Sequence, residues 1–235
     1  MPRISYDPGT DGNDTFSPTP ARDVFFGGVG DDEIDGGAGN DFLDGGAGAD
    51  TLFGGSGWDW LLGGDGDDLI YGGDMGRLRG GAGDDVIHSG DGDIYAIGGD
   101  GDDVIHGGTG AGWFQGGRGS DTIFGGSDFD YIKGGDGDDI LFGGVDDDQL
   151  EGNGGADHFV FRAGEGQDLI VDFEDDVDTL WLDPALWGGE EMSAEEVLEA
   201  FAVEIYNLVL IFPDGSSVVL LTPSAEEMVD DIAFL

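Results

Sequence analysis

Single apolar residues recur every nine positions over the first two thirds of the sequence. From Gly9 to Val160 the chain divides into consecutive frames, and the eighth position is apolar in each of them. These residues are Phe16, Phe25, Ile34, Leu43, Leu52, Leu61, Ile70, Leu78, Ile87, Ala96, Ile105, Phe114, Ile123, Ile132, Leu141, Leu150 and Phe159. One inward side chain between two outward neighbours is typical of a three-residue strand. The pattern therefore predicts short strands that share one core column.

Glycine separates the predicted strands. Positions one, two and four of the frame are mostly Gly, as in GGAGNDFLD at 36–44, and Gly permits positive φ and close backbone approach. Two strands and two such turns close an 18-residue coil, and stacked coils bury the position-eight column between two parallel sheets. One frame, 72–79, is a residue short. We expect the missing residue to fall in the turn at 72–76, so that Leu78 stays in the core column.

Position six is usually Asp, and alternate frames place it on opposite edges of the stack. The odd column is complete and contains Asp14, Asp32, Asp50, Asp68, Asp85, Asp103, Asp121, Asp139 and Asp157. The even column contains Asp23, Asp41, Asp59, Asp130 and Asp148. Its middle third has Gly76, Ile94 and Gly112 in place of Asp. We therefore expect two unequal edges.

The charge supports a metal-binding role for these columns. The chain carries 53 acidic and 7 basic residues, a net charge of −46, with no Cys. Residues 1–160 hold 34 of the acids, of which 32 are Asp, against 6 basic residues. A preference for the shorter side chain indicates carboxylates that must reach a fixed point near the backbone. Such a charge disfavours nucleic acid and anionic membranes, and the lack of Cys excludes disulfides and thiol catalysis.

The frames resemble the GGxGxDxUx nonapeptide of RTX, or hemolysin-type, calcium-binding proteins. The resemblance covers about two thirds of the chain, and so many frames in register are inconsistent with a disordered acidic linker. It implies an all-β fold, a right-handed parallel β-roll, in which the position-six carboxylates and the turn carbonyls bind Ca²⁺. The fourteen Asp residues of the two columns are thus the expected metal ligands. Ca²⁺ takes 6–8 oxygen ligands, whereas Mg²⁺ sheds its water reluctantly.

The spacing of the two columns gives an expected number of ions. Adjacent Asp residues of the odd column define about eight sites between coils, and the even column adds about three, so we expect roughly 8–11 Ca²⁺ ions. The even sites lie between Asp23, Asp41 and Asp59 and between Asp130 and Asp148. The last is weakened because Asp128 and Asp146 replace the position-four Gly.

The sequence changes character near residue 160. We divide the chain into an N-terminal lead-in (1–8), the roll of about 17 frames (9–160) and a β-rich capping segment with short helices (161–235). The capping segment predicts strands at 168–173 and 178–182, a helix from Ser193 to Ala202 with a capping box, a hairpin over 204–222 and a short helix at 224–231. It is similar to the C-terminal region of RTX proteins, which implies an uncleaved signal for the type I secretion apparatus and an extracellular location in a Gram-negative bacterium.

No catalytic signature accompanies these repeats. The sequence has no H-E-x-x-H, no G-x-S-x-G and no P-loop around its only Lys, Lys133. Nor does it contain an apolar run of about 20 residues or an N-terminal signal peptide. We expect a protein that is not an enzyme, binds no nucleic acid and does not insert into membranes.

Two non-enzymatic functions stay open. One is a secreted structural or adhesive protein that folds on binding Ca²⁺. The other is a polysaccharide-binding or accessory module for a separate exported enzyme, which would use the even-face aromatic residues Trp60, Tyr95, Trp113 and Tyr131 or contact a cell surface.

Basic residues and histidines outside the columns have two interpretations each. Arg77 and Arg79 form either a small binding patch or, as we favour, a replacement for missing Ca²⁺ charge. His88 and His106 lie one coil apart, with rings about 5 Å apart along the ladder. Stacked surface rings are favoured over a Zn²⁺ site, because no third ligand is apparent.

Overall fold

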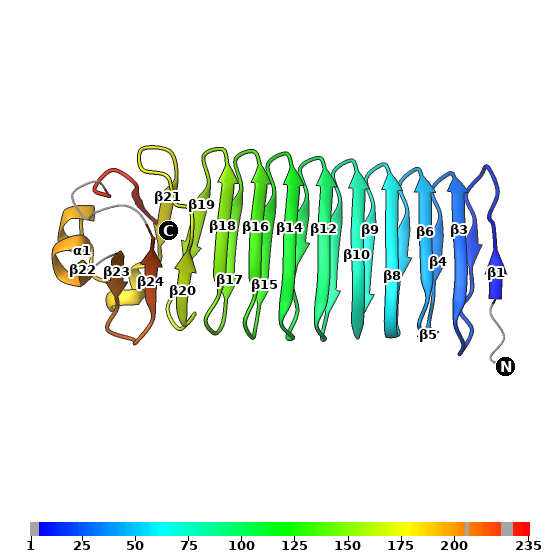
Figure 1. The fold of residues 1–235 in the computed structure, drawn as a ribbon, viewed down its shortest axis with the longest axis horizontal. Coiled ribbons are helices and arrows are strands. Elements are labelled where there is room, and N and C mark those ends of the chain that lie inside the picture. The colour runs from blue at the N-terminus through cyan, green and yellow to red at the C-terminus, as the bar shows by residue number, and fades with distance from the viewer. Residues whose placement is uncertain (1–4, 205–206, 222–227) are drawn as a thin grey trace.

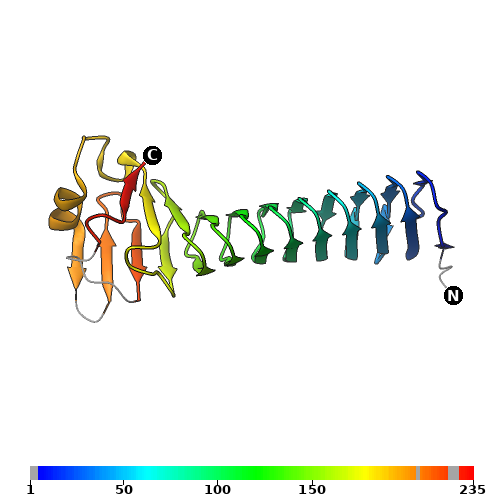
Figure 2. The ribbon, with the colours of Figure 1, turned by 90° about the horizontal axis from the view of Figure 1, so that it is seen from above.

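The chain forms an elongated β-solenoid closed at one end by a cap (Figure 1). This computed structural model describes residues 5–204, 207–221 and 228–235. Two long sheets, here sheet A and sheet B, run the length of the molecule and face each other across the core (Figure 2). The parallel β-roll expected from the repeat is therefore confirmed.

Sheet A takes its strands from the even frames and the start of the frames that follow them. In spatial order it contains β1 (Ser5–Asp7), β3 (Asp23–Val29), β6 (Phe42–Ala47), β8 (Ser56–Asp65), β10 (Met75–Ala82), β12 (Ile94–Asp100), β14 (Gly112–Arg118), β16 (Tyr131–Asp136), β18 (Gln149–Gly154), β20 (Gln167–Ile170), β24 (Ser217–Leu220), β23 (Leu208–Ile211) and β22 (Ala202–Glu204). The short strand β5 (Ala38–Gly39) pairs with β8. All pairings from β1 to β24 along this path are parallel.

Sheet B takes its strands from the odd frames. In spatial order these are β2 (Thr15–Phe16), β4 (Glu33–Asp35), β7 (Thr51–Phe53), β9 (Leu69–Gly73), β11 (Val86–Gly90), β13 (Val104–His106), β15 (Thr122–Gly126), β17 (Ile140–Gly144), β19 (His158–Phe161), β21 (Thr179–Leu182) and β25 (Ile232–Phe234). Partner residues are one coil apart, as in the pair Ile105 and Ile123. Every position-eight residue is buried, so the predicted core column is confirmed.

The short frame leaves this register intact. The chain turns at Asp74, between β9 and β10, and Leu78 pairs with Leu61 on the neighbouring strand. Leu78 is buried in the core cluster. The missing residue therefore shortens the turn and not the strand, as its position in the sequence predicts.

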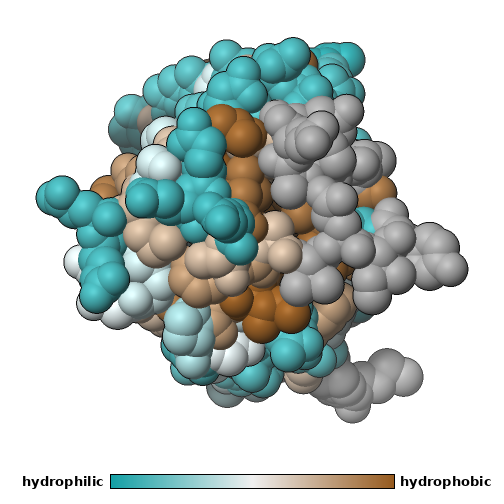
Figure 3. Space-filling view, turned by 90° about the vertical axis from the view of Figure 1, so that its left-hand side faces the viewer, coloured by the Kyte–Doolittle hydropathy of each residue, from teal (hydrophilic) through white to brown (hydrophobic). Residues whose placement is uncertain are grey.

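The cap continues both sheets of the roll. β20 and β21 extend the two sheets by one more coil, β24 pairs in parallel with β20, and β23 and β22 then continue sheet A with antiparallel pairing. A 3₁₀ helix η1 (Pro184–Trp187) and helix α1 (Ala194–Phe201) complete the cap. Residue 160 thus ends the repeat in the sequence but does not end the sheets. Viewed from the cap end, apolar side chains lie between hydrophilic ones (Figure 3).

Local sequence explains α1. Ser193 accepts a hydrogen bond from the Glu196 N–H, and the Glu196 carboxylate accepts one from the Ser193 N–H, which is the predicted capping box. Val197 and Leu198 are buried against the cap core. The helix expected at 224–231 falls largely outside the described residues; its described end is a turn that precedes β25. No helix in the described parts of the chain is long and apolar enough to cross a membrane.

Candidate metal sites along the roll

The odd Asp column forms an unbroken ladder along one edge of the roll. The backbone N–H of each Asp from Asp14 to Asp139 donates to the Oδ1 atom of the next Asp in the column, over 2.6–2.9 Å. On the even edge the same bonds join Asp23, Asp41 and Asp59, and again Asp130 and Asp148. One carboxylate oxygen of each Asp accepts the ladder hydrogen bond, and the other oxygen takes no part in the ladder.

That second oxygen is buried without a hydrogen-bond partner in most column members. The residues concerned are Asp32, Asp41, Asp50, Asp59, Asp68, Asp85, Asp103, Asp121, Asp130, Asp139 and Asp148. A buried polar atom without a partner costs about 1–3 kcal/mol, and more when it is charged. The repetition of such oxygens along both edges therefore indicates a bound ligand, because a ligand would offset this free-energy cost.

The turn carbonyls approach the same places. A Cβ atom added to Gly63, at position one, would lie 2.2 Å from Asp68 Oδ2 and 2.8 Å from the carbonyl oxygen of Gly80, one coil further on. The same arrangement surrounds Gly27 and Gly45. Carboxylate and carbonyl oxygens thus converge between coils beside these position-one Gly residues. This all-oxygen donor set suits Ca²⁺, a hard cation that prefers such ligands, and it also explains why position one has no side chain.

Burial makes these carboxyls weak acids as long as no cation is bound. Desolvation, with like-charged neighbours adding to it, raises the pKa to about 6 for Asp50, Asp59, Asp85, Asp121 and Asp157, to about 7 for Asp68 and Asp148, and to about 8 for Asp103, Asp130 and Asp139. Burial also raises the pKa of Asp32 and Asp41. These carboxyls therefore take up protons near neutral pH unless a bound cation stabilises their charged form.

The first Asp of each column has a different environment. Asp14 accepts hydrogen bonds from the backbone N–H and the hydroxyl of Thr10, both on its Oδ2 atom. Asp23 is held in the same way by Thr19, through both of its oxygens. Thr10 and Thr19 occupy position two, where the later frames mostly have Gly. Hydroxyl and amide donors thus satisfy these two predicted ligands at the open end of the stack.

Both columns continue into the cap. Asp148 N–H donates to Asp168 Oδ1 over 3.0 Å, and Asp157 N–H donates to Asp178 Oδ1 over 2.9 Å. The other oxygen of Asp178 accepts the Glu174 N–H. Burial raises the pKa of Asp168 to about 8. Our reading of the repeat missed both residues, although the second half of the nonapeptide, DxUx, survives at Asp168 and at Asp178.

Apolar side chains fill the gap in the even column. Ile94 stands at position six and is buried, with the small Ala96 at position eight behind it. A Cβ atom on Gly112 would lie 2.1 Å from the ring of Phe114, and one on Gly72 would lie 2.8 Å from a methyl group of Leu78. Core side chains therefore occupy the space that an Asp carboxylate takes elsewhere. This packing agrees with the interrupted column that the sequence predicts.

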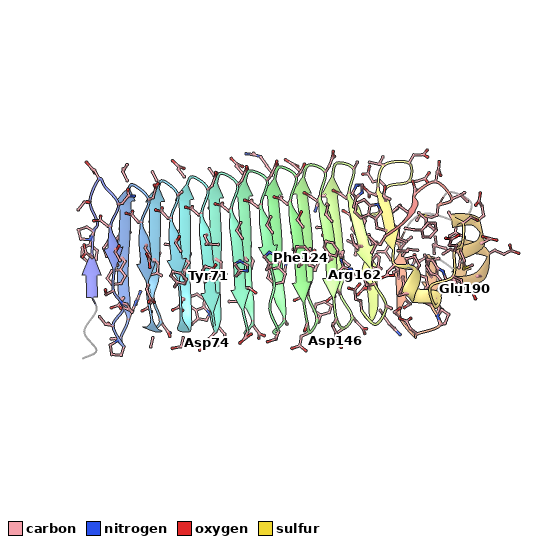
Figure 4. The ribbon with its side chains drawn as sticks, turned by 180° about the vertical axis from the view of Figure 1, so that it is seen from behind. Tyr71, Asp74, Phe124, Asp146, Arg162 and Glu190 are labelled. Carbon is pink, nitrogen blue, oxygen red and sulfur yellow. The ribbon has the colours of Figure 1, made fainter. Side chains whose placement is uncertain are left out.

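Two Asp residues at position four also take a positive φ. Asp128 and Asp146 have φ values of 63° and 79°, whereas Gly at this position mostly has a larger φ, such as 131° at Gly30. Asp tolerates a positive φ better than most residues. Asp130 and Asp148 still stack beside them, each with an unpartnered oxygen. Asp146 lies on the same edge as the Asp74 turn (Figure 4).

Position five supplies a second ladder that the sequence reading did not identify. The Oδ1 atom of Asp84 accepts the backbone N–H of Asp102, whose own Oδ1 accepts that of Ser120. Asn13, Asn40, Asp31, Asp67 and Asp138 accept in the same way from the next coil. These exposed bonds run in the opposite direction to the position-six ladder. They give the position-five Asx residues a structural role that does not require a metal.

Comparison with known proteins agrees with this geometry. The sequence matches the RTX calcium-binding nonapeptide repeat at residues 8–43, 18–52, 53–74, 77–93, 97–132, 124–159 and 133–170, which together span more than half of the chain. The chain belongs to this RTX family. No curated protein matches it. Among solved structures, the extracellular lipase LipA from Serratia marcescens shares 20% identity with a TM-score of 0.34, over 77% of this chain and 40% of the lipase.

Aromatic and histidine side chains of this RTX roll stack into a ladder on the outside of sheet B. Phe53, Tyr71, His88, His106, Phe124 and Phe142 follow one another with ring centroids 4.5–5.0 Å apart and nearly parallel planes. Tyr71 and Phe124 lie on this face (Figure 4). The His88–His106 separation of 4.8 Å confirms the expected stacking. Among the described residues, no third metal-ligating side chain joins them.

Four basic residues of this RTX chain lie on strands of sheet A, namely Arg77, Arg79, Arg118 and Lys133, whereas Arg162 lies over the ring of Phe142 in sheet B. The ion pairs found among the described residues join Arg118 to Asp100 and Asp136, and Lys133 to Glu151. Arg77 instead lies over the ring of Tyr95, with its guanidinium carbon 5.5 Å from the ring centroid. The ion pairs found among the described residues do not include Arg77 or Arg79, and the interpretation that these two residues replace missing Ca²⁺ charge stays a prediction.

Proposed function

We propose that this RTX protein is a secreted, non-enzymatic structural or adhesive protein that folds on binding several Ca²⁺ ions outside the cell. The repeated, buried and unpartnered Asp oxygen at position six is the observation that carries the proposal. Family membership supports calcium as the ion. Export through a C-terminal signal to a type I apparatus of a Gram-negative bacterium is the route that the resemblance of residues 161–235 favours.

The folding mechanism follows from the charge on the columns. Without a cation, 34 acidic residues face 6 basic ones in residues 1–160, and the strands are too short to pair against that repulsion. A cation held between two coils offsets the charge and joins the coils at the same time. The free energy of ion binding then becomes free energy of folding. An extracellular setting with abundant Ca²⁺ would therefore switch folding on.

The two edges should bind different numbers of ions. We expect about eight ions along the odd edge and about three on the even edge, at its two ends, because Leu78, Ile94 and Phe114 fill the middle. Anomalous scattering from crystals of the calcium-loaded protein would locate each ion. Ions beside Gly76, Ile94 and Gly112, in numbers equal to those on the odd edge, would contradict this distribution.

A second candidate function is polysaccharide binding, favoured by a groove on sheet A. The groove has a volume of about 550 Å³, and Arg79, Trp113, Gln115, Arg118 and Lys133 contribute to its lining. Trp113 stacks on Tyr95 with ring centroids 4.2 Å apart, which forms a flat aromatic surface. Aromatic faces and guanidinium groups together suit an acidic sugar chain. This groove gathers three of the seven basic residues of a strongly acidic protein.

Trp113→Ala tests this groove. If the groove binds acidic glycan, the variant should bind polygalacturonate about tenfold more weakly than the parent because the sugar loses its stacking surface, a loss of roughly 1.4 kcal/mol. Isothermal calorimetry with the calcium-loaded proteins would measure it, with neutral dextran as the comparison ligand. Trp58→Ala, which alters an exposed Trp outside the groove, serves as the matched control. Equal binding of polygalacturonate by Trp113→Ala and Trp58→Ala would contradict this function.

A further inference from the structure

A cluster of three carboxylates lies in the cap, away from the inter-coil positions of the two Asp columns. Asp175 and Asp176 belong to the turn between β20 and β21, and Asp231 precedes β25. One carboxylate oxygen from each lies within 4.8 Å of the others. The register of β25 begins with Ile232 opposite Leu180, so Asp231, one residue earlier, is not level with Asp178, the last member of the position-six column. The cluster is therefore a separate feature of the cap.

Asp231 distinguishes this cluster from an ordinary acidic surface. Its side chain is only 5% exposed, and its Oδ2 atom is buried without a hydrogen-bond partner. Asp175 and Asp176 are exposed and close the same site from the solvent side. The Asp231 carboxylate accepts a backbone hydrogen bond from Asp176, but this leaves one buried oxygen without a partner in a group of three carboxylates, which is unfavourable unless positive charge lies among them. Burial and the neighbouring acids accordingly raise the pKa of Asp231 to about 6.

The backbone holds the three carboxylates in place. Glu174 accepts the N–H groups of Val177 and Asp178 at its carbonyl, and Asp176 takes a positive φ of 59°, so the turn is tight. The carbonyl of Asp231 accepts the N–H of Leu180 over 2.8 Å, which ties Asp231 to β21. The turn and the start of β25 are thus fixed to the same strand. The position of the cluster depends on β25 being docked on sheet B.

We propose that Asp175, Asp176 and Asp231 form a separate Ca²⁺ site that fastens β25 to the roll. Three carboxylates and no nitrogen or sulfur ligand make a donor set that suits a hard divalent cation, and two exposed ligands leave room for the water that completes Ca²⁺ coordination. β25 pairs with β21 through three residues and is the last strand of sheet B. The ion adds a second attachment beside this short pairing. Calcium therefore controls closure of the cap as well as stacking of the coils.

Asp231→Asn in the full chain tests the site, with Asp230→Asn as the matched control on the neighbouring residue. Calcium bound per chain, measured by equilibrium dialysis and elemental analysis, should fall by one ion in Asp231→Asn and stay at the parent value in Asp230→Asn. Hydrogen exchange should show calcium-dependent protection of residues 228–235 in the parent and the control. Asp231→Asn should lose that protection, while the repeat residues keep theirs.

Asp176→Asn provides an independent variant if Asp231→Asn fails to fold. Asn tolerates the positive φ at this exposed turn, so the substitution removes charge and one ligand without altering the backbone. It should also lose one ion. An unchanged ion count in the variants, or protection of 228–235 that does not depend on calcium, would overturn the cap site. Either result would leave calcium binding by the repeats untouched, because that is read from the repeat residues in the same samples.

Discussion

Removing Ca²⁺ at neutral pH is expected to unfold the roll almost completely. The ion-free roll buries carboxylates that carry no compensating charge, and the pKa of three of them lies at about 8. At neutral pH the ion-free fold must either keep these carboxyls protonated or bury their charge, whereas in the unfolded chain they ionise in water, which favours unfolding. The short strands between turns gain too little from pairing to offset this. Circular dichroism during titration with a chelator should follow loss of β-structure, and added Ca²⁺ should restore it. Mg²⁺ should restore it poorly.

Acid should partly replace calcium in the same experiment. Because burial raises the folded-state pKa of these Asp residues above the ordinary value, the folded chain binds more protons than the unfolded one. The stability of the calcium-free roll is therefore highest below about pH 4 and falls as pH rises to about 8. Calcium-free protein should show more β-structure at about pH 5 than at neutral pH. β-structure that is independent of both calcium and pH would contradict the folding mechanism.

Calcium affinity should follow the opposite trend with pH. Protons and Ca²⁺ compete for the same oxygens, so binding should weaken in acid. At about pH 5, where the calcium-free chain regains β-structure with protonated carboxyls, binding should release protons. At neutral pH the calcium-free chain is unfolded and its carboxyls are ionised, so the release should be close to zero. Calorimetric titrations in buffers of different ionisation enthalpy would count the released protons, and equal release at the two pH values would contradict this coupling.

Gly101→Ala is expected to destabilise the calcium-loaded protein strongly. Gly101 stands at position four with a φ of 138°, and an added Cβ atom would lie 2.1 Å from the carbonyl oxygen of Gly83 in the preceding coil. Both the backbone conformation and the contact with a backbone atom oppose a side chain there. We expect a loss of about 2–4 kcal/mol in the free energy of unfolding, since strain and overpacking act together. Thermal unfolding in saturating Ca²⁺ measures it.

Gly12→Ala is the matched control, because Gly12 occupies position four of the first frame. No atom lies within 4 Å of an added Cβ atom at Gly12, and its φ is outside the left-handed region. The substitution should change the free energy of unfolding by less than about 0.5 kcal/mol. Equal effects of the two substitutions would show that close stacking of the coils does not constrain position four. A selective effect at Gly101 would locate the constraint between coils.

The repeat by itself determined the core, the strand spacing and the two Asp columns. A nine-residue period is a local property, and a buried column follows wherever each frame adds one apolar residue such as Ile105 or Leu141. The core position of Leu78 in the short frame and the gap in the even Asp column at Ile94 could also be predicted from their positions in the nine-residue frame. These features need no knowledge of distant contacts, since each coil packs only on its neighbours.

The tertiary structure decided what continues the columns and which oxygens lack a partner. Asp168 and Asp178 lie 20 and 21 residues beyond their partners, so loops of irregular length hide them from an 18-residue period. Asp231 reaches Asp175 and Asp176 only because β25 pairs with β21 in sheet B. Thr10 and Thr19 replace the frame's Gly with a side chain that carries a hydroxyl, and only the coordinates show that this hydroxyl donates to an Asp. Sequence fixes which carboxylates are present, whereas burial and hydrogen bonding, which depend on distant segments, determine which of them need a cation.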